Sequence, residues 1–556
     1  MNKTEDRNVA RRLSKVAALV PGGIAIATPL GRPPRSGPRS YDAVTFEQLD
    51  QRTDAIARGL LDWGVQPGMR LAMLVPFGPD FLALTFGLLK AGAVVVLIDP
   101  GMGRRNMVRC LQDARPDGFV AIPQAQAVRS VLRKRFSQAR WNVSVGGKWF
   151  LPGGGRPLES VEVTGRESQT ELPTREDSDA AAVIFTTGST GPPKGVHYTH
   201  GIFNHQIDLI RQRYGIQPGS RDLACFPLFG LFDAMMGVTT IIPDMDPTRP
   251  ADVNPRRVIE AVEQWEIDQA FGSPALWNTV AGYCVKQNQR LPTLRRVLSA
   301  GAPVPPQTLA MLRSVIHPDG EIFTPYGATE SLPVASIESR DVLTDTAHRS
   351  RQGAGTCVGT RFESMQWRVI EINDGPLASI DETREMPAGE IGELMVSGPV
   401  VTEQYVTRSD QNALHKVRDG DRVWHRMGDV GYLDAEDRFW FCGRKAHRVR
   451  TAGGTLYTVP CESIINTHQD VYRSALIGLG AAPEQHPVIV VEPYGSRRPR
   501  SPRAKQRLID ELKQLAASHE LTAAISDIRI HPRGLPVDIR HNSKIFREQL
   551  ADVYRG

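Results

Sequence analysis

The sequence predicts an α/β protein with a large N-terminal domain and a small α+β C-terminal domain. A chain of 556 residues is too long for one compact core. Helical patterns alternate with short apolar runs over residues 45–330, and short alternating strands replace them over residues 353–432. We therefore expect a large N-terminal domain (residues 1–443) of two helix-covered sheets plus a small β-barrel, and a small, mobile C-terminal α+β domain (residues 444–556).

The individual elements follow this order along the chain. Residues 46–64 have helical periodicity and precede an apolar run at 70–76, and residues 256–267 repeat the helix pattern. Strands with alternating polarity are expected at 365–372 and 389–398, in the region of the small barrel. After residue 443, a hairpin and a helix (461–468) are followed by two strands, a second helix and a further strand. This order is typical of a small α+β unit.

Composition narrows the classes of function. Apolar residues make up 41% and charged residues 23%, which is ordinary for a globular protein, and the net charge is only +6. The basic run at 497–505 contains no aromatic residues, so it favours a solvated loop over a nucleic-acid site. We expect no nucleic-acid partner.

Targeting and redox signals favour the cytoplasm. Six cysteines lie without C-x-x-C spacing, which argues against a zinc site or a disulfide framework. The N-terminal residues lack an apolar signal core. The most apolar stretch, residues 81–99, is interrupted by Lys90 and two glycines, so we predict a helix, a turn and a buried strand there and no transmembrane segment.

A phosphate-binding loop is predicted in "AVIFTTGSTGPPKGVHYTH", residues 182–200. Glycines allow backbone N–H groups to approach an anion, and hydroxyl groups with Lys194 add donors. The nucleotide P-loop is excluded because it requires Ser or Thr after the lysine, where this chain has Gly195. A plain Gly/Pro turn between two strands is the alternative for a single loop of this kind.

Four later segments supply further groups that a nucleotide needs. "SAGAP" (299–303) offers a small-residue turn for a flat base, and "YGATE" (326–330) offers an aromatic ring and a carboxylate. Asp429 is expected in a turn, where it can accept both ribose hydroxyls, and Arg444 just beyond a strand. Each alone has a structural alternative, such as a capped turn or a surface ion pair. Together, and in this order, they predict an ATP site.

These segments resemble, over nearly the whole chain, the motifs of the adenylate-forming superfamily of acyl-CoA synthetases, peptide-synthetase adenylation domains and luciferases. The resemblance implies an AMP-forming ligase that uses ATP and Mg²⁺. It assigns the nucleotide to Thr186, Thr187, Ser189, Gly191, Lys194, Gly301, Ala302, Pro303, Tyr326, Gly327, Thr329, Glu330, Asp429 and Arg444. It also implies Glu330 and Thr186 as Mg²⁺ ligands and Lys194, Glu330 and Lys544 as catalytic residues.

Three segments of the chain depart from the superfamily pattern. Lys544 lies two residues further from Pro536 than is usual for the C-terminal lysine, and Ser543 replaces the usual preceding glycine. Gly230 stands where acyl-CoA synthetases usually have a histidine, and Ala446 where the hinge usually has an aspartate. The last two changes concern the half-reaction that uses coenzyme A, so the adenylation half is expected to be complete.

Several stretches resemble one subgroup most, the β-lactone synthetases of bacterial long-chain olefin biosynthesis; they include "FGSPAL", "TPYGATE", "HRMGDVGY" and "PVDIRHNSKI". This implies adenylation of a 2-alkyl-3-hydroxy long-chain fatty acid, whose hydroxyl then closes a β-lactone, with residues 225–237 and 271–277 around the chains. Complexes with other olefin-pathway enzymes are expected from the same resemblance. The alternatives are a long-chain acyl-CoA or acyl-AMP ligase and, in another class, an inactive nucleotide-binding regulator.

Overall fold

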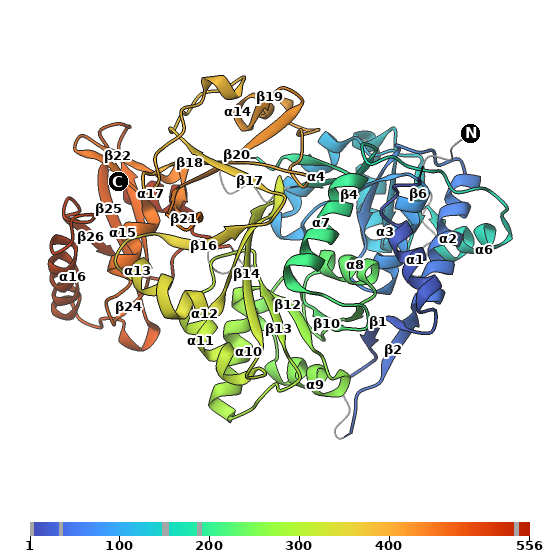
Figure 1. Cartoon of the computed structure of the whole chain (residues 1–556), viewed down its shortest axis with the longest axis horizontal. Helices are drawn as coiled ribbons and strands as arrows, with labels where there is room; N and C mark the ends of the chain where they lie inside the picture. Colours follow the sequence, from blue (N-terminus) through green and yellow to red (C-terminus); the bar gives the residue numbers. More distant parts are fainter. Residues whose placement is uncertain (1–4, 33–36, 147–154, 186–191, 539–543, 556) are drawn as a thin grey trace.

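The computed structural model contains two large sheets with covering helices and a small C-terminal unit (Figure 1). It describes residues 5–32, 37–146, 155–185, 192–538 and 544–555. In Figure 1 the C-terminal unit, coloured orange to red, lies at the opposite end of the molecule from the N-terminus. The predicted fold class is confirmed by this arrangement and by the solved structures compared below.

The first sheet has seven strands in the order β7-β6-β5-β3-β4-β8-β9. All neighbouring strands are parallel except the last pair, β8 and β9, which form an antiparallel hairpin around the predicted phosphate loop. The strands are β3 (Arg70–Leu74), β4 (Val94–Leu97), β5 (Gly118–Ala121), β6 (Trp141–Ser144), β7 (Arg156–Pro157), β8 (Ala180–Phe185) and β9 (Gly195–Thr199).

The second sheet has fourteen strands and changes from parallel to antiparallel along its length. Its parallel part is β1 (Ile24–Pro29), β11 (Thr239–Ile241), β10 (Arg221–Ala224), β12 (Gln269–Gly272), β13 (Arg296–Ser299) and β14 (Glu321–Ala328), with β2 (Tyr41–Thr45) antiparallel at the edge. Its antiparallel part is β15 (Ser331–Glu338), β16 (Thr356–Arg361), β21 (Arg438–Arg444), β20 (Arg422–Leu433), β18 (Gly392–Ser397), β17 (Gln366–Ile370) and β19 (Lys416–Asp419). The region predicted as a small barrel therefore continues this sheet, because the β14–β15 hairpin reverses the chain.

Helices cover both sheets in the order that the periodicity predicts. The helices of the N-terminal part are α1 (Arg11–Leu19), α2 (Phe46–Asp62), α3 (Pro79–Lys90), α4 (Arg104–Ala114), α5 (Pro123–Val131), α6 (Leu158–Glu167), α7 (His200–Tyr214), α8 (Pro227–Met236), α9 (Pro255–Trp265), α10 (Pro274–Gln287) and α11 (Pro306–Val315). Three short helices follow: α12 (Ser339–Asp341), α13 (Ala347–Arg351) and α14 (Asn412–His415). Thr45 and Gln48 form a reciprocal capping box that fixes where α2 begins.

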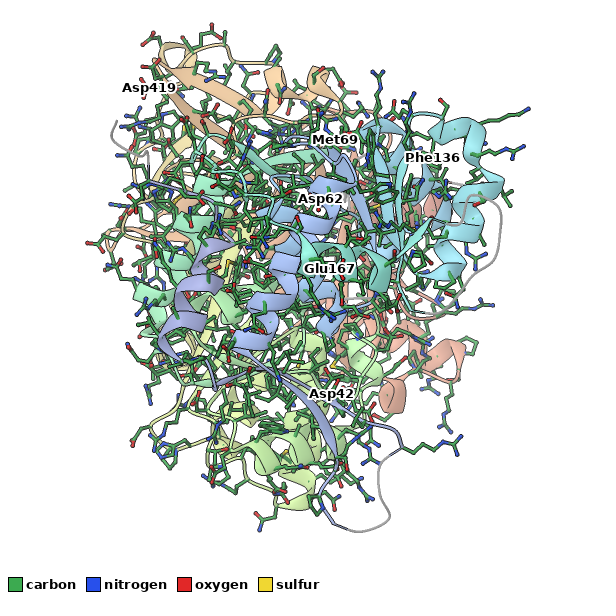
Figure 2. All side chains as sticks on the ribbon, turned by 90° about the vertical axis from the view of Figure 1, so that its right-hand side faces the viewer. Asp42, Asp62, Met69, Phe136, Glu167 and Asp419 are labelled. Carbon is green, nitrogen blue, oxygen red and sulfur yellow. The ribbon has the colours of Figure 1, made fainter. Side chains whose placement is uncertain are left out.

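Two of these helices pack with their backbones nearly in contact. A Cβ atom on Gly165 of α6 would lie 1.7 Å from the carbonyl oxygen of Ala55 in α2, and a Cβ on Gly59 would lie 2.0 Å from the carbonyl oxygen of Val161. Only glycine fits at such a crossing. Asp62 and Glu167, the last residues of the two helices, both lie on the face seen in Figure 2.

The apolar stretch at 81–99 forms the predicted helix, turn and strand. It is the buried helix α3 followed by the buried strand β4. Lys90 is fully buried, and its ammonium lies 2.6 Å from carboxylate oxygens of both Asp50 and Asp54, which explains how a cation is accommodated there. Among the residues that the structure describes, no helix is both long and apolar enough to cross a bilayer.

The C-terminal unit has cores of its own. A three-stranded sheet of β24 (Val471–Leu479), β25 (His486–Pro493) and β26 (Asp527–Ile530) packs against α15 (Thr458–Ile465), α16 (Pro502–Ala517) and α17 (Arg547–Tyr554). A hairpin of β22 (Val449–Thr451) and β23 (Gly454–Leu456) leads into it. The boundary after residue 443 stays a prediction.

Candidate active site

The predicted phosphate loop connects β8 and β9, and part of it can be placed. Thr186, Thr187, Ser189 and Gly191 lie outside the described residues. At the end of the loop, the backbone N–H of Gly195 donates to Oγ1 of Thr407 at 2.7 Å, and Val406 N donates to the carbonyl oxygen of Gly195 at 2.9 Å. The end of the loop is thus fixed by a segment more than two hundred residues away.

Lys194 is held beside two side chains that the motif does not contain. Its ammonium nitrogen lies 3.3 Å from Nε2 of His415 and 4.7 Å from the centre of the Tyr405 ring. Burial lowers the pKa of Lys194, and the carboxylate of Glu330 opposes this effect. The lysine therefore lies in the field of the predicted Mg²⁺ ligand.

Glu330 is buried at the turn of the β14–β15 hairpin. Its Oε1 accepts a hydrogen bond from the hydroxyl of Tyr405 at 2.8 Å, and its carbonyl oxygen accepts from Thr402 N at 2.9 Å. The carbonyl oxygen of Thr329 accepts from the hydroxyl of Tyr198 at 2.5 Å. Groups of three metal-binding side chains are absent from the described residues, so a cation here would need oxygen atoms from a bound phosphate beside Glu330.

The segments predicted to hold adenine lie at one end of neighbouring strands. Gly301 follows β13 in a left-handed conformation (φ 94°) and starts the turn that contains Ala302 and Pro303. The register that sets Leu298 opposite Phe323 brings this turn towards Tyr326 on β14. Gly327, next in β14, is in close contact with the neighbouring strand, because a Cβ there would lie 2.7 Å from the carbonyl oxygen of Ser331. The structure thus brings the two predicted base-binding segments together.

The prediction that Asp429 lies in a turn is wrong. Asp429 is inside the twelve-residue strand β20, just after Gly428, whose positive φ of 67° accompanies a shift of register against β18. The bulge, which the glycine makes possible, directs the carboxylate into the site. Arg444 is likewise the last residue of β21 and not beyond it.

Asp429 is buried at the centre of a charged group. The hydroxyl of Tyr326 donates to its Oδ2, and Nη1 of Arg444 lies 3.0 Å from its Oδ1. Burial raises the pKa of Asp429, while the charges of Arg444 and Lys544 and the bond from Tyr326 lower it. No side chain in the described part of the molecule donates a well-aligned hydrogen bond to Oδ1, so this buried oxygen suits an added hydroxyl donor.

Lys544 is near enough to Asp429 for its charge to affect that carboxylate. Its own backbone is fixed, because Lys544 N donates to Oδ1 of Asp538 at 2.8 Å and Asp538 N donates to the carbonyl oxygen of Lys544 at 3.0 Å. The C-terminal lysine therefore lies within electrostatic range of the predicted ribose carboxylate despite the unusual spacing from Pro536.

Comparison with known proteins identifies the chain's family. A sequence model described as "AMP-binding enzyme" matches residues 17–406, more than two thirds of the chain. The chain belongs to the AMP-binding enzyme family. It is an AMP-forming ligase, and the resemblance predicted from its motifs is confirmed.

Two relatives within this family carry the same name. The chain is 45% identical over 550 residues to an olefin β-lactone synthetase of Stenotrophomonas maltophilia (strain K279a), with 98% of this chain and 97% of the relative covered. It is 44% identical, with the same coverage, to an olefin β-lactone synthetase of Xanthomonas campestris pv. campestris. The predicted resemblance to β-lactone synthetases is thereby confirmed as well.

Solved AMP-binding enzymes share the fold. The amide bond synthetase McbA from Marinactinospora thermotolerans aligns with a TM-score of 0.77 at 21% identity, covering 99% of both chains. ATP-bound MatB from Rhodopseudomonas palustris aligns with a TM-score of 0.77 at 19% identity, also covering 99% of both. At these identities the likeness concerns the fold alone.

The helix with the unusual glycine packs against aromatic rings. Phe229 of α8 stacks on Phe271, with ring centres 3.6 Å apart and planes inclined by 12°. A Cβ on Gly230 would lie 2.8 Å from Cζ of Phe77, so this ring fills the space where the family usually has a histidine. Trp277 belongs to the segment expected to line the acyl pocket. It is instead fully buried in a separate apolar core, which α10 forms with α9 and α11.

The segment predicted to be the hinge has an uncharged residue at its centre. Ala446 is exposed in the short turn Lys445–His447. The adjacent Lys445 has its ammonium 3.0 Å from Oε1 of Glu393, a fully buried carboxylate that is also paired with Arg426. The ion pair at this point of the chain is therefore made by Lys445, the residue next to the pivot position that Ala446 occupies.

Sequence reasoning missed Tyr405 and His415. They lie in residues 404–416, between two recognised motifs, and neither belongs to a spacing pattern that indicates chemistry. Their partners Glu330 and Lys194 are 75 and 221 residues away in the chain. Only the fold brings them together.

Proposed function

We propose that this chain is an ATP-dependent β-lactone synthetase whose substrate is a 2-alkyl-3-hydroxy long-chain fatty acid. The observation that carries the proposal is the 45% identity, over 98% of the chain, to an olefin β-lactone synthetase. Two features of the site support it. Phe77 fills the place of the usual histidine beside Gly230, and Ala446 replaces the pivot aspartate, and both changes affect positions used in thioester formation.

In the first half-reaction, a carboxylate oxygen of the acid attacks the α-phosphorus of ATP, and pyrophosphate leaves. Lys194 and the phosphate loop hold the departing phosphates, and Lys544 donates to the charge that develops on the attacked phosphoryl group. The buried Oδ1 of Asp429 suits a ribose hydroxyl, and Arg444 offsets the charge of that carboxylate. Glu330, with Thr186, would hold Mg²⁺, which neutralises phosphate charge.

In the second half-reaction, the 3-hydroxyl oxygen of the same substrate attacks the acyl carbon. The bond from the acyl carbon to the phosphate oxygen breaks, AMP leaves, the hydroxyl proton is released, and a four-membered ring forms. The nucleophile is already attached to the substrate, so the site needs only to fold the chain and exclude water. Phe226, Phe229 and Phe271 provide an apolar surface beside the nucleotide segments on which alkyl chains could pack.

Among the histidines that lie near the motifs, two have structural contacts. Nδ1 of His200 accepts a hydrogen bond from Val9 N at 3.2 Å, and its pKa is lowered to about 4 by burial. His425 is buried with Nδ1 3.2 Å from the carbonyl oxygen of His415. Neither has the exposure that a base for the 3-hydroxyl requires.

The chemistry also places the enzyme in a reaction sequence. A condensing enzyme and a reductase would supply the 2-alkyl-3-hydroxy acid, and a decarboxylase would convert the β-lactone into an olefin. A complex with such enzymes, and a cytoplasmic location in keeping with six buried free thiols, form part of the proposal.

The test is to incubate the enzyme with the racemic 2-alkyl-3-hydroxy acid, ATP and Mg²⁺ in the absence of any thiol. Mass spectrometry should find a product lighter than the acid by one water, with stoichiometric AMP. A product that forms only with coenzyme A, and that is a thioester, would replace the proposal by the acyl-CoA ligase.

A further inference from the structure

We infer that Tyr405 and His415 are positioning residues that together set the placement of Lys194 and Glu330 for Mg·ATP. The inference rests on the roles proposed above for those two residues. It adds two side chains that lie outside the motifs described above. It follows from one geometric fact. The ring of Tyr405 contacts the ammonium of Lys194, and the hydroxyl of Tyr405 donates to the carboxylate of Glu330.

The backbone of Tyr405 is fixed against the end of the phosphate loop. Tyr405 pairs with Val196 of β9 across an antiparallel bridge, and its N–H donates to Oδ1 of Asn412 at 2.9 Å. Its side chain is 2% exposed. A rigid backbone and a buried ring leave the hydroxyl little freedom, which is the condition for orienting another group.

The hydroxyl of Tyr405 determines the direction of the Glu330 carboxylate. It donates to Oε1 at 2.8 Å, which leaves Oε2 as the carboxylate oxygen that a cation would use. The tyrosine is the donor in this contact, because an ionised carboxylate oxygen can only accept a hydrogen bond. Glu330 is itself 8% exposed, so a carboxylate without this donor would be poorly solvated.

The ring of Tyr405 lies near two ammonium groups. Lys194 Nζ is 4.7 Å from the ring centre and Lys416 Nζ is 5.6 Å from it. Lys416 is anchored elsewhere, because it donates to the carbonyl oxygen and the hydroxyl of Thr402. Lys194 is the cation in the phosphate loop, so the ring fixes the separation between that cation and the carboxylate bound by its own hydroxyl.

His415 completes the arrangement by accepting a hydrogen bond from Lys194. Its Nε2 is 3.3 Å from Nζ, and its ring meets that of Tyr405 edge to face, with centres 6.0 Å apart. Burial and the Lys194 charge lower the pKa of His415 to about 4, so the imidazole is neutral and can accept. A neutral acceptor directs the ammonium without cancelling its charge towards phosphate.

Tyr405→Phe tests the hydroxyl while keeping the ring. Isothermal titration calorimetry of ATP binding at increasing Mg²⁺ should show half-saturation at roughly tenfold higher Mg²⁺ than for wild type, as loss of a hydrogen bond to a charged group predicts. ATP binding without Mg²⁺ should be unchanged. Tyr214→Phe is the matched control, because this buried hydroxyl donates to Ser336 at 3.1 Å and not to Glu330, and its Mg²⁺ profile should equal that of wild type.

His415→Phe and His415→Gln test the second residue. The phenylalanine keeps the edge contact but removes the acceptor, and it should weaken ATP binding about fivefold to tenfold at saturating Mg²⁺. The glutamine carbonyl oxygen should restore most of that loss. Circular dichroism and the Tm without nucleotide establish that each variant is folded.

Glu330→Gln separates the inference from the proposed function. If it shifts the Mg²⁺ profile while Tyr405→Phe does not, or if both His415 variants bind ATP like wild type, the inference is overturned and the β-lactone synthetase proposal stands. If Glu330→Gln itself has no effect on Mg²⁺ dependence, Glu330 is not the metal ligand, and both the assigned site and this inference fail. Lactone formation, measured separately, then decides the function.

Discussion

The ring of Phe77 occupies the space in front of Gly230. Phe77 follows strand β3 of the first sheet, and Gly230 lies in α8, which packs on the second sheet. A Cβ on residue 230 would lie 2.8 Å and 3.1 Å from two ring carbons of Phe77 and 3.1 Å from Cγ2 of Thr240. The contact joins the two sheets beside the proposed acyl surface, so the glycine and the ring must be considered as a pair.

Gly230→Ala should therefore destabilise the protein. The added methyl group must displace the Phe77 ring, which packs edge to face on Phe81, or press against Thr240, and overpacking of this kind costs about 1–3 kcal/mol. Urea unfolding measures the change. Gly282→Ala is the control, since nothing lies within 4 Å of a Cβ there and α10 should gain about 0.5–1 kcal/mol of helix stability.

The double variant Phe77→Ala/Gly230→Ala tests the pairing directly. Removing the ring makes room for the methyl group, so the second substitution should cost less than it does in the presence of Phe77. Additive effects would mean that the two residues do not limit one another. A Gly230 variant that is stable and dependent on coenzyme A would speak against the proposed reaction.

Lys544→Ala should abolish most of the adenylation activity. Loss of one charged donor to the transition state is expected to remove about 2–4 kcal/mol of stabilisation, measured as ATP–pyrophosphate exchange. The backbone bonds between Lys544 and Asp538 should hold the segment in place. Lys513→Ala, at an exposed position of α16, is the control. Exchange at the wild-type rate would assign the role to another lysine.

Asp429→Asn should raise the KM for ATP more than it lowers kcat. The buried carboxylate would lose its charge-assisted bonds to the ribose, a loss of about 1.5–3 kcal/mol, while Lys194 and Lys544 still contact the phosphates. Tyr326 keeps a partner, because the amide oxygen still accepts. Steady-state exchange kinetics at varied ATP give the two constants, and an unchanged KM would remove Asp429 from the ribose site.

How far the sequence could predict this site depends on how local each feature is. The loop that ends at Lys194 and the turn at Gly301 are each one continuous stretch of sequence. Their glycines indicate a backbone that can approach a ligand closely. Asp429 was expected in a turn because a glycine such as Gly428 is typical of turns. In the structure this glycine instead makes a bulge inside a strand. Tyr405 could not be predicted, since its role arises only when its segment pairs with β9.

A buried pair of carboxyl groups should make the free energy of unfolding depend on pH. Like the role of Tyr405, this pair could not be predicted from the sequence. Asp222 of β10 and Asp233 of α8 contact each other, and one oxygen of each has no donor unless the other group is protonated. Burial raises the pKa of both groups, and the charge of Asp222 raises that of Asp233 further; Asp268 and Arg296 are the other charged groups that act on the pair. The folded pKa values therefore lie above the unfolded value of about 3.9.

The sign of the effect follows from proton binding. Above about pH 4 the folded protein holds more protons than the unfolded chain, so stability falls as pH rises through the folded pKa. Between pH 5 and 8 we expect a loss of roughly 2–4 kcal/mol from this pair. Asp233→Asn supplies a permanent donor and should reduce that slope in urea unfolding, whereas Asp381→Asn, at an exposed position, should not. Parallel slopes for all three proteins would show that the pair is not protonated when folded.

The strongest functional prediction concerns a substrate analogue without the 3-hydroxyl group. Its carboxylate and the proposed ATP-binding residues Lys194, Asp429 and Lys544 are unchanged, so adenylation should proceed at a rate near that of the hydroxy acid. No internal nucleophile then reaches the acyl carbon, and the acyl-AMP should remain bound, because the proposed reaction requires that water be excluded from the anhydride. A rapid-quench experiment should show one equivalent of pyrophosphate per enzyme in a burst, followed by slow release of AMP, whereas the hydroxy acid turns over continuously.

Addition of coenzyme A should not accelerate the slow phase, since Phe77 fills the position next to Gly230 and Ala446 carries no pivot charge. Fast AMP release with a thiol, and a thioester product, would show that the enzyme transfers its acyl group to coenzyme A after all.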